Sequence, residues 1–305
     1  EIPKRDWSSD VCSSDLNGSL GGWIANASGE IVLTHAPNSG EVWYHFRVDG
    51  VEGKTLTFVF ENARIDFYGG DSLPAISYDQ ENWEYLKKRW IQPLTNDLNR
   101  VRYSFTHTFA ANRAWLAFAP PYVNQRLDRL IAEISTLPHV SVESICQTPI
   151  KNLSIPLIVI TDPETPITDK HGVLFLAREE ALECASSWLC DGLIRFLLSD
   201  DPVAAALKRR CVFLIVPVFD RDGVALGSAV HPLSAQGTSV FWTETWPETS
   251  YSFFEQRQLK RFLQSWKDSG KPLHESFRIH SNGWGQDYFR REHCSDSNLA
   301  VQESL

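Results

Sequence analysis

The spacing of apolar positions along the chain changes near residue 140. Before that point, apolar residues form short runs rich in β-branched and aromatic side chains, and turn residues such as Asp49-Gly50 separate the runs. This pattern is typical of strands that bury one face in a sandwich of two sheets. We therefore predict an N-terminal antiparallel β-sandwich over residues 17–137, with strands at Ile31–Leu33, Val42–Val48, Leu56–Phe60, Tyr103–Phe109 and Trp115–Phe118.

A short helix and a linker are predicted to end this half of the chain. Apolar residues recur at helical spacing from Leu127 to Ile134, directly after Asn124, and this spacing predicts an amphipathic helix. The segment Leu137-Pro138-His139 follows, and its proline favours a linker. The boundary between two domains is therefore predicted at residues 137 and 138.

Residues 138–292 show a different pattern, in which short apolar runs alternate with longer segments of helical spacing. Such alternation indicates an α/β domain with a mixed, mostly parallel sheet covered by helices on both faces. The segment Phe219–Thr249 is predicted to be a long irregular loop. Strands are predicted at Leu157–Ile160, Val173–Ala177, Cys211–Pro217 and Ser276–His280. One helix is predicted after Glu183 and a second from Pro202 to Arg209. A third helix is predicted to begin at a capping box formed by Ser252 and Glu255 and to end at Gly270.

The two ends of the chain differ from the rest. The chain contains no methionine, so we expect it to start inside a longer reading frame. Residues 1–16 include the near-repeat SSDVCSSDL, which resembles translated adapter sequence, and we predict that they are non-native or disordered. Residues 293–305 are polar and aperiodic, and we predict a frayed or foreign tail.

Composition and charge exclude several classes of protein. With 43% hydrophobic and 22% charged residues, the chain of 305 residues is expected to fold. A formal net charge of -9 argues against a nucleic-acid partner, and no apolar run reaches the roughly 20 residues of a membrane span. The six cysteines form no CxxC pair, so neither a zinc knuckle nor a disulfide framework is indicated. The cysteine pattern is compatible with a reducing or an oxidising compartment.

Candidate chemistry lies in the turn after the strand Val173–Ala177. Glu180 and Glu183 are three residues apart in that turn, and His280 ends a later strand. Two carboxylates and one imidazole can form a three-ligand metal site with an open position for water. The alternative is structural, because glutamates at a helix start are favoured by the macrodipole and a strand-end histidine is commonly hydrogen-bonded or solvated. Spacing alone leaves both interpretations open.

A longer resemblance favours the metal. The run AREEALECASSWLCDGLIRFLLSDDPVAAALKRRCVFLIVPVFDRDGVALG resembles zinc carboxypeptidases of the cytosolic-carboxypeptidase-like branch, and the segments WYHFRVDGVEGKTLTF and LAFAPPY resemble the β-sandwich of that branch. The similarity runs in order over about residues 20–290. It implies a carboxypeptidase-type α/β/α domain, one zinc ion, hydrolysis of a C-terminal peptide bond, a peptide or protein tail as substrate or ligand, and a cytoplasmic location.

The resemblance also assigns the metal ligands, with one departure. Glu183 and His280 match two ligands of the family, whereas Glu180 stands where the family has its first zinc histidine. Two carboxylates cancel the charge of Zn²⁺, so the ion polarises its water less and harder divalent cations compete better. We therefore expect weak zinc binding or replacement of zinc by another divalent cation.

Further departures affect the substrate site. Val230 and the pair Ser239-Val240 stand where the family has an arginine and an Asn-Arg pair that hold the terminal carboxylate of the substrate. The general-base glutamate of the family lies well beyond the third ligand, and this chain ends 25 residues after His280, so we expect a truncated domain without that base.

The remaining candidates for substrate binding are three basic residues, and each has a simpler interpretation. Arg178 could orient a ligand or balance the charge of the glutamates, and His231 could bind the ion or be solvated; Arg221 replaces the proline of the NPDGV loop of the family. We expect an impaired or inactive metallocarboxypeptidase-like protein. The alternative is a non-catalytic module that binds peptides or another ligand.

Overall fold

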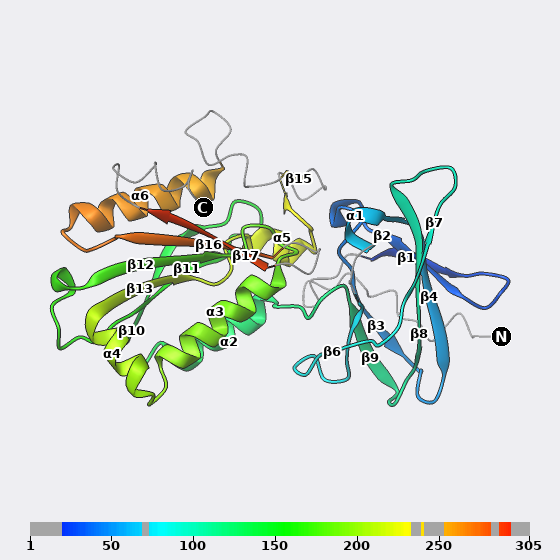
Figure 1. Ribbon diagram of the computed structural model, residues 1–305, viewed down its shortest axis with the longest axis horizontal. Coiled ribbons are helices and arrows are strands. Elements are labelled where there is room, and N and C mark those ends of the chain that lie inside the picture. The colour runs from blue at the N-terminus through cyan, green and yellow to red at the C-terminus, as the bar shows by residue number, and fades with distance from the viewer. Residues whose placement is uncertain (1–19, 69–72, 233–238, 241–252, 282–286, 294–305) are drawn as a thin grey trace. The chain divides into compact units, whose positions relative to one another are not determined.

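The computed structural model describes residues 20–68, 73–232, 239–240, 253–281 and 287–293 (Figure 1). Its contacts divide the chain into two compact units, described separately below. We call them the β unit, made of residues 1–123, 223–240 and 282–286, and the α/β unit, made of residues 124–222, 241–281 and 287–305. The predictions for residues 1–16, for Ser252 and for the predicted tail beyond His293, which ends β17, lie outside the described residues.

The β unit contains a five-stranded and a four-stranded sheet, as the alternating pattern predicted. All pairings within these sheets are antiparallel except the pairing of β2 with β4, which is parallel and departs from the prediction. The five-stranded sheet has the order β1 (Leu20–Ala25), β2 (Ile31–His35), β4 (Thr55–Arg64), β8 (Arg100–Thr108), β7 (Trp90–Pro93), and the four-stranded sheet has the order β3 (His45–Asp49), β9 (Arg113–Ala117), β5 (Ala75–Ser77), β6 (Glu84–Tyr85). The short elements are η1 (Pro37–Ser39), α1 (Ile65–Tyr68), β14 (His231–Pro232) and β15 (Ser239–Val240).

Aromatic side chains join the two sheets of the β unit. Phe58 of β4 packs against Phe46 of β3, with ring centroids 5.6 Å apart, and it stacks on Phe105 of β8 at 5.3 Å. Tyr44 lies 5.0 Å from Phe60 in the same core. Each ring buries a large apolar area, so this cluster supplies much of the hydrophobic stabilisation of the β unit.

The α/β unit is built on one six-stranded mixed sheet. Its three central strands, β13, β12 and β16, are parallel to one another, while the outer pairings are antiparallel. The carboxyl ends of the parallel strands therefore meet at one edge of the sheet, where open α/β sheets place ligands. The order is β10 (Val140–Gln147), β11 (Ser154–Ile160), β13 (Cys211–Val216), β12 (His171–Ala177), β16 (Glu275–Ser281), β17 (Asp287–His293).

Helices cover both faces of this sheet, which confirms the predicted α/β/α arrangement (Figure 1). Alternate residues of the strands face opposite sides: Leu214 of β13 packs with Leu259 and Trp266 of α6, whereas Ile215 packs with Ile194 of α3. The helices are α2 (Asn124–Ile134), α3 (Cys184–Leu197), α4 (Pro202–Arg210) and α6 (Phe254–Asp268), with the short η2 (Ile167–Asp169) and α5 (Arg221–Leu226).

Three predictions about element limits need correction. The helix from Asn124 was assigned to the first domain, but its residues Leu130 and Ile134 are buried in the core of the α/β unit, so the boundary lies near residue 124 instead of 137. The predicted loop Phe219–Thr249 contains helix α5. Helix α6 begins after Phe253, whose backbone N–H donates to the side chain of Gln256 at 3.1 Å, so the cap lies one residue after the predicted start at Ser252.

Among the described residues, no helix is both long and apolar enough to span a membrane.

His35, at the end of β2, is held in its neutral form. Its Nε2 lies 2.7 Å from the hydroxyl of Tyr68, and that hydroxyl donates its proton to the backbone oxygen of Val42 at 2.6 Å. The Nε2 atom of His35 must therefore carry the proton that it shares with Tyr68. Burial lowers the pKa of His35 to about 4, and the nearby Glu41 opposes this effect only in part.

We predict that replacing Gly172 by alanine destabilises the α/β unit. A Cβ atom at Gly172 in β12 would lie 2.1 Å from the carbonyl oxygen of Pro272, and relief of such a clash moves backbone at a cost of about 1–3 kcal/mol. Gly192→Ala in α3 is the matched control, because no heavy atom lies within 4 Å of its new Cβ and alanine favours a helix by about 1 kcal/mol. Urea unfolding followed by circular dichroism measures both. Equal stability of the Gly172→Ala protein and its parent would contradict the close approach.

We predict that His35 makes the β unit less stable in acid. Its pKa of about 4 lies below the 6.5 of an ordinary histidine, so between these values the unfolded chain binds more protons and the free energy of unfolding falls as the pH is lowered. The full loss is about 3 kcal/mol. His35→Gln keeps a donor to Tyr68 but cannot titrate, so its stability should change less between pH 6.5 and 4. Identical losses in parent and variant would contradict the prediction.

Candidate functional site

The turn that joins β12 to α3 carries three glutamates to the carboxyl edge of the sheet. Arg178 follows the last residue of β12 and has a φ of 58°, a left-handed conformation that is uncommon for a residue with a side chain. Its backbone N–H donates to Ser186 Oγ at 3.1 Å, and its backbone oxygen accepts from the N–H of Asp220 at 2.9 Å. Both bonds fix the direction in which the chain leaves the strand.

The guanidinium of Arg178 lies inside this turn. The residue is fully buried, and its Nε donates to the backbone oxygen of Ala181 at 2.6 Å. Its Nη1 lies 3.3 Å from Ser187 Oγ, which donates in turn to the backbone oxygen of Pro217. Arg178 was a candidate for substrate binding, and two of its guanidinium nitrogens, Nε and Nη1, contact the turn itself.

His280 in β16 is held between two carboxylates. Its Nδ1 lies 3.0 Å and 3.3 Å from the two carboxylate oxygens of Glu183, and its Nε2 lies 3.1 Å from Glu179 Oε2. The three side chains are buried, with at most 8% of each exposed. The structure thus brings together two of the predicted ligands, Glu183 and His280, and adds Glu179, to which the sequence analysis gave no role.

A second cation fixes Glu179. The Nε and Nη2 atoms of Arg278 donate to its two carboxylate oxygens at 2.7 Å and 2.9 Å, a bidentate geometry that holds a carboxylate strongly in both position and direction. Arg278 and His280 are two residues apart on β16, so their side chains leave the same face of the strand. The alternation in the predicted strand Ser276–His280 contained this signal, because it puts an arginine beside the histidine.

The charges of the cluster stabilise one another. Burial alone would lower the pKa of His280, but its hydrogen bonds to Glu179 and Glu183 raise it to about 10. Burial opposes ionisation of Glu179 as well, but the hydrogen bonds from His280 and Arg278 hold its pKa below the usual range. For Glu183 burial prevails and raises the pKa. The side chains of His280 and Arg278 therefore face those of Glu179 and Glu183 in a buried site.

The residues fit a metal ion only in part. Two ligands of one ion at roughly 2 Å each lie about 3.2 Å apart in tetrahedral geometry, which matches the spacing between His280 Nδ1 and Glu183. Glu180 is buried in the same turn. Within the described residues, however, no three or more His, Cys, Asp or Glu side chains are grouped so that they could hold an ion.

The other two candidates for substrate binding, Arg221 and His231, are both buried. Arg221 is buried, and its guanidinium donates to Asn124 Oδ1 at 3.0 Å, to the backbone oxygen of Ser154 at 2.7 Å and to Asp128 at 2.8 Å. It thus ties α5 to α2 and β11. His231 is buried in β14 and belongs to the β unit.

Comparisons with known proteins agree with the fold. The chain is 26% identical over 208 residues to cytosolic carboxypeptidase 2 of Danio rerio, which covers 61% of this chain and 29% of that protein. It is 25% identical over 256 residues to cytosolic carboxypeptidase 6 of Mus musculus, covering 79% and 46%. The chain thus spans less than half the length of these curated relatives.

A solved structure has the same fold. The metallo-carboxypeptidase from Burkholderia cenocepacia superposes with a TM-score of 0.71 over 89% of this chain and 70% of that one, at 24% sequence identity. The family model described as the cytosolic carboxypeptidase N-terminal domain matches residues 28–118, and the model described as zinc carboxypeptidase matches residues 124–297. The zinc carboxypeptidase model matches more than half of this chain, and the chain therefore belongs to the zinc carboxypeptidase family.

Proposed function

We propose that this chain is a zinc carboxypeptidase homologue that keeps the family fold but does not turn over peptides at a measurable rate. The family removes residues from the C-termini of peptides with the help of zinc. That reaction requires an ion that activates water, a cation that fixes the terminal carboxylate and a base that moves the proton. We infer that this chain lacks the first two, the ion that activates water and the cation that fixes the terminal carboxylate.

The observation that carries the proposal is the environment of His280. Both of its ring nitrogens face carboxylates, and the partner of Nε2 is itself paired with Arg278. Glu180 occupies the position of the first zinc histidine of the family. A catalytic zinc site has three protein ligands and an open position, so we infer that Glu183 and His280 hold at most one divalent ion, zinc or another, and hold it weakly.

The binding of a substrate carboxylate is also weakened. Arg178, Arg221 and Arg278 all donate to groups of the protein, and Val230 and Val240 stand where the family has arginines. A valine cannot form the bidentate fork that recognises a carboxylate. A peptide or protein C-terminal tail remains the ligand class that we propose from the family. We also propose a cytoplasmic location, because the curated relatives are named cytosolic carboxypeptidases.

We predict that the purified 305-residue chain hydrolyses no peptide with an acidic, basic or apolar C-terminal residue, with or without added zinc. Glu180→His should restore a third ligand and raise zinc affinity by about 10-fold to 100-fold, measured by calorimetry, without restoring robust turnover. Glu183→Ala, made in each background, should remove the zinc binding and is the matched control. Robust hydrolysis by the unmodified chain, abolished by Glu183→Ala, would show that the proposal is wrong.

The same geometry assigns a structural role to the pair of Glu179 and Arg278. Both side chains are almost fully buried, at 0% and 7% exposure. Removal of one member of a buried ion pair leaves an uncompensated charge and costs roughly 3–5 kcal/mol, whereas replacement of both by apolar residues is often nearly neutral. The pair should therefore behave as one unit in stability measurements.

We predict that Glu179→Leu lowers the free energy of unfolding by roughly 3–5 kcal/mol, and that the double variant with Arg278→Met recovers part of this loss. The control is the half-exposed pair of Glu133 and Arg195, 3.0 Å apart, where Glu133→Gln should cost at most about 1 kcal/mol. Chemical unfolding of the single and double variants gives the coupling energy. Strictly additive losses would contradict the assignment of the pair as one unit.

A further inference from the structure

Two histidines of the α/β unit face each other where strands β12 and β16 begin. His171 is the first residue of β12, and His274 directly precedes Glu275, the first residue of β16. Their imidazole rings are stacked, with centroids 4.4 Å apart and ring planes 11° apart. These are the amino ends of parallel strands. The pair therefore lies at the opposite edge of the sheet from the glutamates, and it is independent of the function proposed for them.

The hydrogen bonds that join these strand ends depend on one ring nitrogen of His274. The backbone N–H of His274 donates to the backbone oxygen of Gly172 at 2.9 Å, and the N–H of Gly172 donates to Nδ1 of the His274 ring at 2.9 Å. An imidazole nitrogen accepts a hydrogen bond only when it carries no proton. The ring of His274 must therefore be neutral, with its proton on Nε2, for the amide of Gly172 to keep this partner.

The surroundings of His274 oppose a second proton on its ring. Burial and the neighbouring His171 lower the pKa of His274, and Glu275 offsets this effect in part. Nε2 of His171 lies 3.6 Å from Oε1 of Glu275, so a first proton taken up by the pair is better placed on His171. A proton on each ring would set two like charges 4.4 Å apart.

The two lysines next to these histidines in the chain are directed elsewhere. The ammonium of Lys170 donates to Thr161 Oγ1 at 2.7 Å, and that of Lys271 lies over the ring of Trp266, 4.3 Å from its centroid. The charge state of the His274 ring is therefore governed by the stacked imidazole and by the carboxylate beside it.

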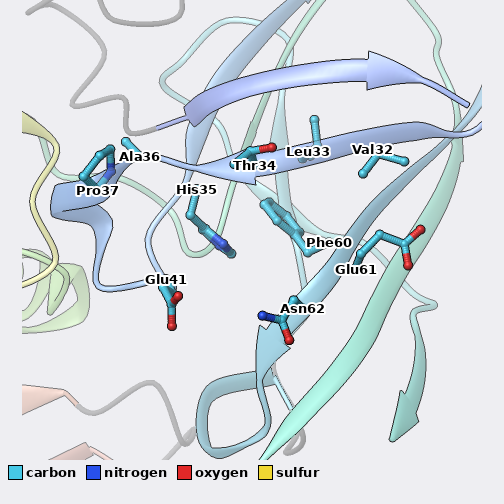
Figure 2. A pocket seen from close by; sticks show the side chains of 10 residues that line it. All are labelled: Val32, Leu33, Thr34, His35, Ala36, Pro37, Glu41, Phe60, Glu61 and Asn62. Atoms are coloured by element: carbon cyan, nitrogen blue, oxygen red, sulfur yellow. The ribbon is translucent and has the colours of Figure 1, made fainter. Parts of the chain in front are cut away.

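His35 of the β unit is a useful comparison, because it is also a stacked histidine. Figure 2 shows its ring beside that of Phe60, with centroids 4.3 Å apart. A phenyl ring binds no proton, and the pKa of His35, about 4, keeps this histidine neutral between pH 5 and 7. Both rings of the pair at the start of β16 can bind a proton near neutral pH, so this pair is suited to respond to mild acid.

We propose that His171 and His274 form a pH-sensitive clasp that holds the connection between α6 and β16 against the start of β12. At neutral pH the clasp is closed, because Nδ1 of His274 accepts from Gly172. In acid, a proton on Nδ1 removes this acceptor and places an N–H against the N–H of Gly172, and the two charged rings repel each other. Residues 271–274 then separate from β12, while β16 stays paired from Glu275 onward.

Amide hydrogen exchange of Gly172, measured by NMR, tests the clasp. Between the 6.5 of an ordinary histidine and the lower pKa of His274, opening that takes up a proton becomes up to about 10-fold more frequent per pH unit. After correction for the intrinsic rate, the protection of Gly172 should fall roughly 10-fold from pH 7 to pH 5, whereas Leu214 in the central strand β13 should keep its protection.

Two results of this experiment would overturn the proposal. Equal protection of the Gly172 amide at both pH values would mean that no clasp opens. An equal loss of protection at Gly172 and Leu214 would mean that the whole α/β unit unfolds in acid.

Two variants and one control separate the clasp from a general effect of acid. His274→Asn keeps an acceptor oxygen for Gly172 but cannot titrate, so the protection of that amide should change less than about 2-fold between pH 7 and 5. His171→Phe keeps a stacked ring without its charge, so the pKa of His274, read from its Cε1–H signal, should rise. His107→Gln removes a partly buried histidine of the β unit and should leave the exchange of Gly172 unchanged. A full loss of protection in the His274→Asn protein, or no rise in the pKa of His274 in the His171→Phe protein, would contradict the clasp.

Discussion

The left-handed turn at Arg178 is the constraint on which the site in the α/β unit depends. It directs the chain from the end of β12 into a tight loop, and the buried guanidinium holds that loop through Ala181 and Ser187. Ser186 closes the same turn from α3, accepting from the N–H of Arg178 and donating to the backbone oxygen of Glu183 at 2.7 Å. The turn that carries the glutamates is therefore held by its own backbone, by Ser186 and Ser187, and by the guanidinium of Arg178.

The sequence predicted much of this fold because the hydrophobic pattern changes with the layer that each element joins. The α/β/α unit follows from strands whose alternate residues face opposite layers, as Leu214 and Ile215 do. The limits of elements were less predictable. Leu130 and Ile134 have the spacing of any amphipathic helix, and only tertiary packing decides which core receives them. The parallel pairing of β2 with β4 was missed for the same reason, since strand direction leaves no periodic signal.

The site was predicted in part. Glu183 and His280 were expected to lie close together because their residue types and positions resemble zinc ligands, and the structure places them 3.0 Å apart. The roles of Glu179 and Arg278 depend on a contact between residues 99 positions apart, which local spacing does not encode. Arg221 illustrates the opposite error. A basic residue in a loop suggests an exposed ligand contact, but three acceptors from distant elements bury it.

The acidic and basic side chains of the buried cluster lie in direct contact with one another. In a metal site, the ion neutralises its carboxylate ligands, and its removal leaves them in mutual repulsion. In this chain, Glu179 and Glu183 face two basic side chains supplied by one strand, Arg278 and His280. An ion entering this cluster would compete with the contact between Glu183 and His280 and would bring a positive charge close to Arg278. The described contacts form a buried ion-pair network, in which the loss of one member leaves an uncompensated charge.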